Sequence, residues 1–312
     1  MGGGISTGAL AGAVSAAGGL GTVGLLPAHL MRDELRKAAE LAPERPIAAN
    51  FLLPFTAREH VDACIAASAA SVCLFFGFDR EIVERLHDHG VVVMHQVGTA
   101  AQAKRAAADG ADVLVVQARE AGGHLLGVRS LEDALAEVRA AIASKPVLAA
   151  GAITTKEDVR RAVAAGADGV VAGTRFLLTD ESNAHVAYKK RVVGAQRTIE
   201  TTLFGMAWPD RHRVVPNAAT RRWCRADGRA RLVPRAINRA AKPLTRLMPE
   251  TAADKVVARQ RPWLPMFSPA PLLAGMDERL VEVTALYAGE GARRIDAITP
   301  AADAVRDLAA GF

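Results

Sequence analysis

The fold of this chain is decided by one stretch, Val113-Leu114-Val115-Val116-Gln117-Ala118-Arg119-Glu120-Ala121-Gly122-Gly123-His124-Leu125-Leu126-Gly127. Its first four residues are apolar and predict a short buried strand. The adjacent Gly122 and Gly123 allow positive φ angles and a close approach of the backbone to a ligand. His124 follows directly, and a titratable ring in the loop after a buried strand is typical of parallel α/β enzymes. A histidine in a loop is more often solvated or a cap, so a catalytic role for His124 needs support from the rest of the chain.

A helix and a short apolar strand alternate on both sides of this stretch. The predicted strands are 20–25, 47–51, 71–76, 91–94, 113–116, 146–150 and 169–172. The predicted helices are 7–17, 27–41, 56–68, 79–89, 100–109, 130–144 and 156–165, with Thr56, Asp79, Thr99, Ser130 and Thr154 or Thr155 at their starts. Serial strand–helix units predict a parallel sheet. Seven strands fit either an open sheet or a closed (β/α)8 barrel with one strand missing, and the spacing favours the barrel.

Composition limits the class of protein. The chain has 312 residues, half of them hydrophobic, and a formal charge of +6, which is enough for a fully developed core. Its first 25 residues carry no charge, but frequent glycines and the lack of a basic start argue against a membrane span or a signal peptide. The three cysteines form no CxxC pair, so we expect a reducing, cytoplasmic location and no metal site.

The character of the sequence changes after Phe176. Residues 189–262 hold 18 Lys or Arg against five Asp or Glu, and no strand is evident there. We therefore expect a barrel over 1–188, a basic and mostly helical insertion over 189–275, and C-terminal helices over 276–312 that pack back on the barrel. Helices are predicted at 277–287 and 300–310. No nucleic-acid-binding motif accompanies the basic residues, which leaves a solvated cap or an attraction for anionic substrates.

Two further strands end in glycine-bearing loops, at Gly151 and at Gly173. In a (β/α)8 barrel the loops after the last two strands commonly bind phosphate through backbone N–H groups. Glycines end strands in many proteins, but two such loops in tandem point to a phosphorylated cofactor such as FMN. No GxGxxG lies between a strand and a helix, so a dinucleotide site of the Rossmann type is not expected.

The sequence resembles the nitronate monooxygenases, formerly called 2-nitropropane dioxygenases, which are FMN-dependent (β/α)8 barrels with an inserted helical region. The matching segments are, in order, Met1-Gly2-Gly3 with Ser6-Thr7, Gly18-Gly19-Leu20-Gly21, Asn50, Gln117 with Glu120-Ala121-Gly122-Gly123-His124, Ala149-Ala150-Gly151, Gly166-Ala167-Asp168-Gly169-Val170, Gly173-Thr174-Arg175-Phe176, Glu181-Ser182 with His185, and Tyr287-Ala288-Gly289. These blocks do not separate the family from flavin-dependent enoyl-ACP reductases and NADH:quinone reductases on the same barrel.

The resemblance implies a site in which His124 faces the flavin as a base or an electrostatic partner. The residues expected around FMN are Gly2, Gly3, Asn50, Gln117, Gly122, Gly151, Ala152, Gly173 and Thr174. Ala152 stands where the family usually has a second glycine. The strand that normally precedes Met1 is absent, so we expect the barrel to lack its first strand, with lower stability and weaker FMN binding as a result.

The activity implied is the oxidation of alkyl nitronates by O2 to carbonyl compounds and nitrite, in a monomer or homodimer. The alternatives are an NAD(P)H-dependent flavin reductase of enoyl thioesters or quinones, and a flavin-binding protein without turnover. His185 and His95 are further histidines of interest. His185 is expected in a surface helix pair with Glu181 and Lys189, and His95 is a second candidate for the pocket.

Overall fold

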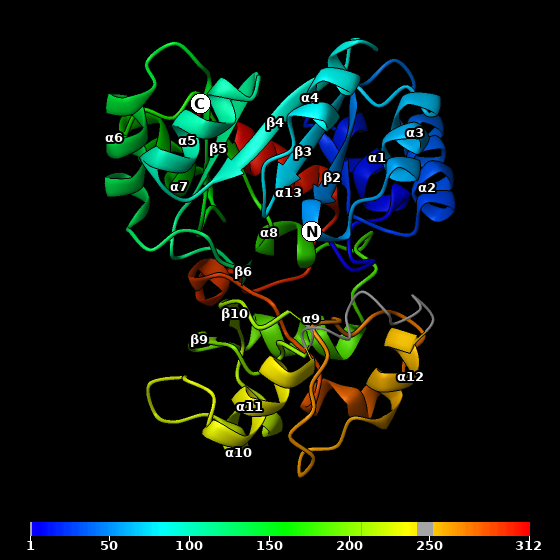
Figure 1. The fold of residues 1–312 in the computed structure, drawn as a ribbon, viewed down its shortest axis with the longest axis vertical. Helices are drawn as coiled ribbons and strands as arrows, with labels where there is room; N and C mark the ends of the chain where they lie inside the picture. Colours follow the sequence, from blue (N-terminus) through cyan, green and yellow to red (C-terminus); the bar gives the residue numbers. More distant parts are fainter. Residues whose placement is uncertain (1, 207, 242–251) are drawn as a thin grey trace.

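The computed structural model describes residues 2–206, 208–241 and 252–312, which form two lobes (Figure 1). One lobe contains a curled parallel sheet of seven strands with helices on its outside, as the sequence predicts. The strands follow one another in the order of the chain and are β1 (Gly21–Val23), β2 (Ile47–Leu52), β3 (Ser71–Phe75), β4 (Val92–Val97), β5 (Val113–Gln117), β7 (Val147–Ala150) and β8 (Gly169–Val171).

The helices of this lobe alternate with the strands. They are α1 (Gly8–Ala16), α2 (Ala28–Leu41), α3 (Arg58–Ala66), α4 (Arg80–His87), α5 (Ala100–Ala108), α6 (Leu131–Ala141), α7 (Lys156–Ala164), the short α8 (Thr174–Leu177) and the C-terminal α13 (Ala301–Ala309), with a 3-10 turn η1 (Leu53–Phe55) after β2. In the described part of the chain, no helix is long and apolar enough to cross a membrane.

Polar side chains start most of these helices where the sequence predicts. The side chains of Asp79, Thr99, Ser130 and Thr155 each accept a hydrogen bond from a backbone N–H in the first turn of α4, α5, α6 and α7. Thr56 is an exception, and its predicted role was wrong. Its hydroxyl donates to the carbonyl of Leu52, and α3 begins after an alanine instead.

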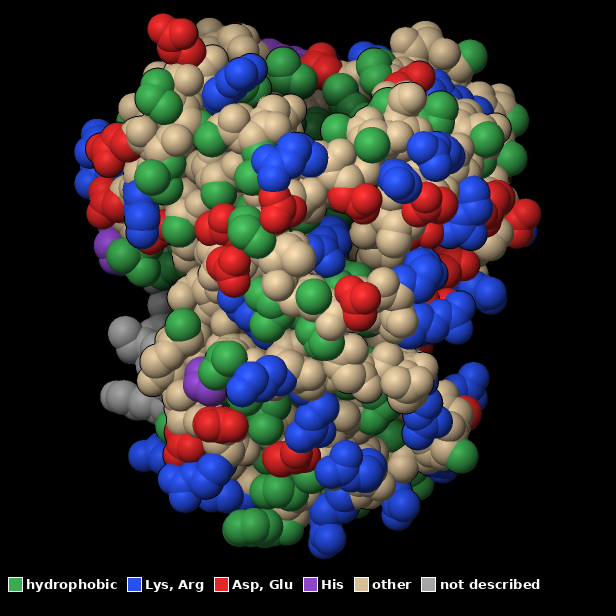
Figure 2. Space-filling view, turned by 180° about the vertical axis from the view of Figure 1, so that it is seen from behind, with side chains coloured by type: hydrophobic (Ala, Val, Ile, Leu, Met, Phe, Trp, Pro, Cys, Tyr) green, Lys and Arg blue, Asp and Glu red, His purple; other side chains and the backbone are tan. Residues whose placement is uncertain are grey.

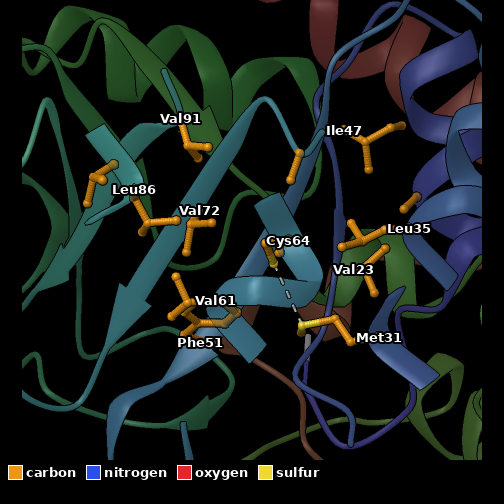
Figure 3. Packing of buried hydrophobic residues seen from close by; sticks show 14 of the residues in the cluster. Val23, Met31, Leu35, Ile47, Phe51, Val61, Cys64, Val72, Leu86 and Val91 are labelled. Atoms are coloured by element: carbon orange, nitrogen blue, oxygen red, sulfur yellow. Dashed lines mark hydrogen bonds between the residues drawn. The ribbon is translucent and has the colours of Figure 1, made fainter. Parts of the chain in front are cut away.

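Two layers of apolar side chains hold the strands in place. On the inner face, Ala48, Cys73, Met94, Val115 and Ala150 fill the middle of the curled sheet. On the outer face, the first strands pack against α2, α3 and α4 through a larger cluster (Figure 3). Alternate residues of a strand point to opposite faces, so the register of the sheet fixes which side chains reach the inside.

The sheet has two edges among the described residues, because β1 pairs only with β2 and β8 only with β7. Helices α1 and α13 pack against each other on that side through Leu10, Val14, Ala301 and Val305. Val171 at the edge of β8 is 40% exposed. The seven-stranded count and the expectation of a barrel short of one strand are thus both met by the topology.

The second lobe is formed by residues 186–294, which include the predicted insertion (Figure 1). Its elements are α9 (Val186–Val193), β9 (Ile199–Thr201), β10 (His212–Val214), α10 (Ala218–Trp223), α11 (Leu232–Ala241), α12 (Ala252–Arg259), η3 (Glu278–Glu282) and η4 (Glu290–Arg294). The absence of strands predicted for this region was wrong, since β9 and β10 join β6 (Gly123–His124) in a small antiparallel sheet. The helix predicted over 277–287 was also wrong, because only a 3-10 segment forms there.

Candidate active site

His124 lies in β6, where the loop after β5 meets the insertion. It pairs in register with His212 of β10, and the N–H of Leu125 donates to the carbonyl of Arg211. The histidine is buried, and its Nε2 has no hydrogen-bond partner in the described structure. Burial lowers the pKa of His124 well below its usual value of 6.5, and the adjacent His212 lowers it further. The ring is therefore neutral at pH 7 and able to accept a proton.

The loop that carries His124 is held in shape by Gln117. The side-chain amide of Gln117 donates to the carbonyl of His124 at 2.9 Å, and its oxygen accepts from the N–H of Leu126 at 2.7 Å. Gln117 is buried at the carboxyl end of β5, opposite Ala150 of β7. Its polar atoms are thus bonded to the loop, which makes it a residue that positions His124.

Aromatic rings surround His124. The indole of Trp208 stacks on the imidazole with ring centroids 3.6 Å apart and an interplanar angle of 12°. His212 and Tyr287 lie at 5.1 and 5.5 Å, and Phe76 meets the imidazole edge-on at 6.1 Å. These rings exclude water, which is the physical cause of the low pKa of His124.

His212 is held in one tautomer. Its Nδ1–H donates to the carbonyl of Asp210 at 3.0 Å, and its Nε2 accepts from the N–H of Phe204 at 3.3 Å. Burial lowers the pKa of this ring to about 4, although the bond to the Asp210 carbonyl opposes the change. His212 is therefore a neutral, fixed neighbour of His124.

The structure brings several of the other predicted residues to the same end of the sheet. Asn50 lies on the inner face of β2, in register with Cys73, and its amide donates to the Cys73 carbonyl. Gly2 lies beside the end of β2, where an added Cβ would be 3.9 Å from Leu52 Cδ1. The hydroxyl of Thr174, next to Gly173 at the start of α8, accepts from the N–H of Gly289 at 2.9 Å.

Packing of the chain on itself explains some of the predicted glycines. A Cβ on Gly122 would lie 2.5 Å from the N of Gly289, and a Cβ on Gly3 would lie 2.9 Å from Pro271 Cδ. Gly289 follows the insertion, and Pro271 lies near the end of the insertion. Residues 287–291 thus pass over the loops after β5 and β8, and the small residues there permit this close approach.

His95 and His185 do not join the site. His95 stands in register with Leu74, which belongs to the outer cluster, so its ring faces the helices and stacks on Phe78. His185 is the N-cap of α9 and accepts from the N–H of Ala187. The predicted surface pairing with Glu181 and Lys189 was wrong, because Glu181 accepts from the N–H of Ala301 and Lys189 is buried against the Thr179 carbonyl.

The loop after β7 offers free backbone donors. Gly151 and Ala152 have φ angles of 143° and 53°, and within the described residues the N–H groups of Ala152 and Ile153 find no acceptor. Turned backbone of this kind directs N–H groups toward an anion. A hollow of about 170 Å³ adjoins this loop. Its charged side chains are Arg161, Arg293 and Arg294 against Glu120, Glu132, Asp158 and Glu290.

The residues present fit a phosphorylated flavin in their chemistry. The free N–H groups at Ala152 and Ile153 suit a phosphate, because turned backbone directs them toward an anion and three arginines line the hollow beside four carboxylates. The Nε2 of His124 has no partner among the described residues and is free to bond to a group that reacts beside the flavin ring. The indole of Trp208 covers the imidazole, so access to His124 depends on this side chain.

The sequence did not predict Trp208 and His212 as residues of the site. Both lie in the insertion, about 85 residues after His124, and no periodic pattern links them to the barrel. The one available signal is the short run Trp208-Pro209-Asp210-Arg211-His212, which gathers aromatic and titratable residues in a loop.

Comparison with known proteins agrees with this geometry. The sequence model of a family described as "Nitronate monooxygenase" matches residues 1–71 and 55–311. A nitronate monooxygenase of Neurospora crassa is 40% identical over 124 residues, which are 38% of this chain and 32% of that protein. The (3aS,4S,5R,7aS)-5-hydroxy-7a-methyl-1-oxo-octahydro-1H-indene-4-carboxyl-CoA dehydrogenase of Mycobacterium tuberculosis is 33% identical over 201 residues, 62% of this chain and 56% of that protein. The chain thus spans only about half, or less, of the length of these curated relatives.

Two solved structures are similar over nearly the whole chain. A nitroalkane oxidase from Streptomyces ansochromogenes superposes with a TM-score of 0.77 at 27% identity, covering 100% of this chain and 93% of that one. FabK from Thermotoga maritima gives a TM-score of 0.77 at 24% identity, covering 99% of this chain and 89% of that one, which bears on the fold alone.

Proposed function

Because the chain belongs to the nitronate monooxygenase family, we propose that it oxidises alkyl nitronates with O2 to carbonyl compounds and nitrite, using FMN. The observation that carries this proposal is the state of His124. Its imidazole is buried, neutral at pH 7 and unpartnered at Nε2, at the carboxyl ends of parallel strands. Sites of (β/α) barrels lie at that end.

Each residue of the site has a separate role in the proposed reaction. FMN, when bound, supplies the acceptor for the electrons of the nitronate. The N–H groups of Ala152 and Ile153 are suited to hold its phosphate. The neutral Nε2 of His124 accepts the α-proton of a nitroalkane, and the resulting imidazolium is the counterion of the nitronate left beside it. Gln117 keeps the imidazole in place through the backbone of its loop.

A second candidate is an NAD(P)H-dependent reaction on thioesters. It is favoured by the Mycobacterium tuberculosis relative, whose name specifies a CoA derivative, and by the basic insertion, which would attract the phosphates of such a substrate. The same His124 would then donate or accept a proton on the acyl chain.

An anaerobic experiment separates these candidates. The FMN-loaded protein is mixed with propyl-1-nitronate in one cell and with NADH in another, and the flavin absorbance is followed. Bleaching by the nitronate, with nitrite released when O2 is admitted, is the expected result. Bleaching by NADH alone would favour the thioester or quinone reductase, and no bleaching in either cell would favour a flavin-binding protein without turnover.

A further inference from the structure

Trp208 reaches from the insertion into the mouth of the barrel. There it stacks on His124 at 3.6 Å and meets Phe55 and Phe76 edge-on at 5.2 and 5.0 Å. Phe55 follows β2 and Phe76 follows β3, so the four rings come from the ends of two strands, from β6 and from the insertion. We call Phe55, Phe76, His124 and Trp208 the aromatic box.

Among the described residues, the polar bonds of Trp208 are to its own loop. The indole Nε1–H donates to Asp210 Oδ2 at 2.6 Å, and the backbone N–H donates to the carbonyl of Gly205 at 3.0 Å. Of the other rings around His124, Tyr287 is anchored outside that loop, whereas His212 bonds to Asp210 within it. The hydroxyl of Tyr287 donates to the Pro269 carbonyl, and His212 is fixed at both of its nitrogens. The N–H of Met206 donates to the Phe267 carbonyl and the Arg211 carbonyl accepts from Leu125, so both ends of the segment are held. The indole can therefore leave His124 by rotation of its own side chain, at the cost of its ring contacts and of the bond to Asp210.

The box also defines what can take the place of the indole. Two phenyl rings stand roughly perpendicular to the indole and the imidazole lies parallel to it, so the box offers apolar ring surface and one unpartnered nitrogen. Offset and edge-on ring contacts stabilise a bound ring beyond the effect of the area that they bury. A flat conjugated group restores these contacts when it replaces the indole, whereas a saturated chain does not.

We propose that Trp208 determines which ligands reach His124: it occupies the face of the imidazole, and a flat conjugated group must displace it to bind. The displacing group is the flavin ring of FMN or the planar nitronate, and only this identification rests on the proposed function. Trp208 is in either case a specificity-determining residue.

The first arm of the test uses FMN. Association of FMN with the flavin-free protein is followed by stopped-flow flavin fluorescence for the wild type, Trp208→Phe and Trp208→Ala. If the indole competes with the flavin ring, Trp208→Ala binds FMN faster and more tightly, by about tenfold or more, because no covered state has to open. Trp263→Ala is the matched control, since Trp263 is 65% exposed and lies outside the box. Trp208→Phe keeps a ring at this position should the alanine variant fold poorly.

The second arm uses propyl-1-nitronate with FMN-loaded protein. If the nitronate is the competing group, Trp208→Ala lowers its KM and leaves the binding of FMN unchanged. A third readout is independent of turnover: in flavin-free Trp208→Ala, the pKa of His124 measured by NMR rises toward 6.5, because water reaches the ring while His212 and Tyr287 stay in place.

Two results would overturn the proposal. One is that FMN association, the KM for the nitronate and the pKa of His124 all match the Trp263→Ala control. The other is a weaker FMN affinity in Trp208→Ala, because the indole would then support the bound flavin. A protein that binds FMN as expected but forms no nitrite would refute the proposed function and leave the role of Trp208 standing.

Discussion

At the scale of single side chains, the buried imidazole of His124 governs the proposed chemistry. In His124→Ala we expect FMN binding to persist, while turnover of neutral nitroalkanes falls roughly 10²–10⁴-fold, the range for a lost general base. Preformed nitronates should lose less, because their proton is already gone. Steady-state nitrite release with nitroethane and with ethyl nitronate measures both.

A histidine far from the site provides the control for this experiment. His89 is exposed at the end of α4, where its ring bonds to the Arg85 carbonyl, so His89→Gln should leave both rates unchanged. Equal losses on both substrates in His124→Ala would reassign the ring to stabilisation of charge. Unchanged rates would make it structural.

The second side chain with a measurable signature is His212. Its pKa falls from 6.5 to about 4 on folding, so the unfolded chain binds the proton more readily. The stability that this histidine contributes is complete above pH 6.5 and is lost as the pH falls toward 4, by on the order of 3 kcal/mol. Urea unfolding at pH 7 and pH 4.5 should therefore show a smaller pH effect in His212→Gln than in the wild type. An identical pH effect in both proteins would contradict the assignment.

For single residues, the sequence predicted which side chains belong to the site better than it predicted their hydrogen bonds. His124 and Gln117 were both expected at the site, and both lie at the end of the β5 region. The bonds of Gln117 to its own loop could not be predicted, because they depend on the turn between residues 118 and 126. Gly122 was expected beside the flavin. In the structure Gly289, which lies 167 positions later in the chain, approaches Gly122 so closely that a side chain would not fit there.

At the scale of elements, the small sheet of β6, β9 and β10 joins the two lobes. Arg213 of β10 strengthens this junction from a buried position, because its guanidinium donates to the Arg119 carbonyl at 2.7 and 3.2 Å and lies 3.2 Å from Glu290. Arg213→Met should lower the free energy of unfolding by about 2–3 kcal/mol, as expected for lost bonds to a charged group.

Hydrogen exchange adds a local test of the same element. The amides of β6 should exchange faster in Arg213→Met, because the loop before the strand loses the bonds from the guanidinium to the Arg119 carbonyl. Arg229→Met is the matched control, since the side chain of that arginine is 80% exposed and forms an ion pair with the neighbouring Asp227. If β6 exchanges at the same rate in both variants, the guanidinium does not hold the junction.

The sequence predicted the seven strands of the barrel because each is an apolar run followed by a helix, and a polar side chain caps four of these helices, α4 to α7. It missed β6, β9 and β10 because strands of two or three residues carry no alternation that can be read. The helix expected over 277–287 failed for a related reason. Its apolar residues serve contacts made by extended chain, where Tyr287 pairs with Val214.

At the scale of the whole molecule, the insertion is a basic lobe set against the barrel. Figure 2 shows Lys and Arg side chains gathered over the lower half of the molecule, which the insertion forms. Exposed arginines include Arg225, Arg231, Arg235 and Arg239 on and around α11. The sequence already placed the excess of positive charge in residues 189–262, whereas the fold determines which of these side chains are exposed.

This distribution of charge makes a prediction about the rate of substrate capture. A positive lobe beside the mouth of the barrel raises the local concentration of an anion, and salt screens that attraction over about 10 Å at 0.1 M. The kcat/KM for ethyl nitronate should therefore fall as ionic strength rises, while the kcat/KM for neutral nitroethane stays constant in the same buffers. Replacing Arg231, Arg235 and Arg239 together by Gln should flatten the dependence for the anion, because these side chains are exposed and belong to one face of the insertion. If kcat/KM for ethyl nitronate and for nitroethane changes equally with ionic strength, the arginines are a solvated surface without a role in substrate capture. Salt-dependent retention of the protein on DNA would instead support a role in binding nucleic acid.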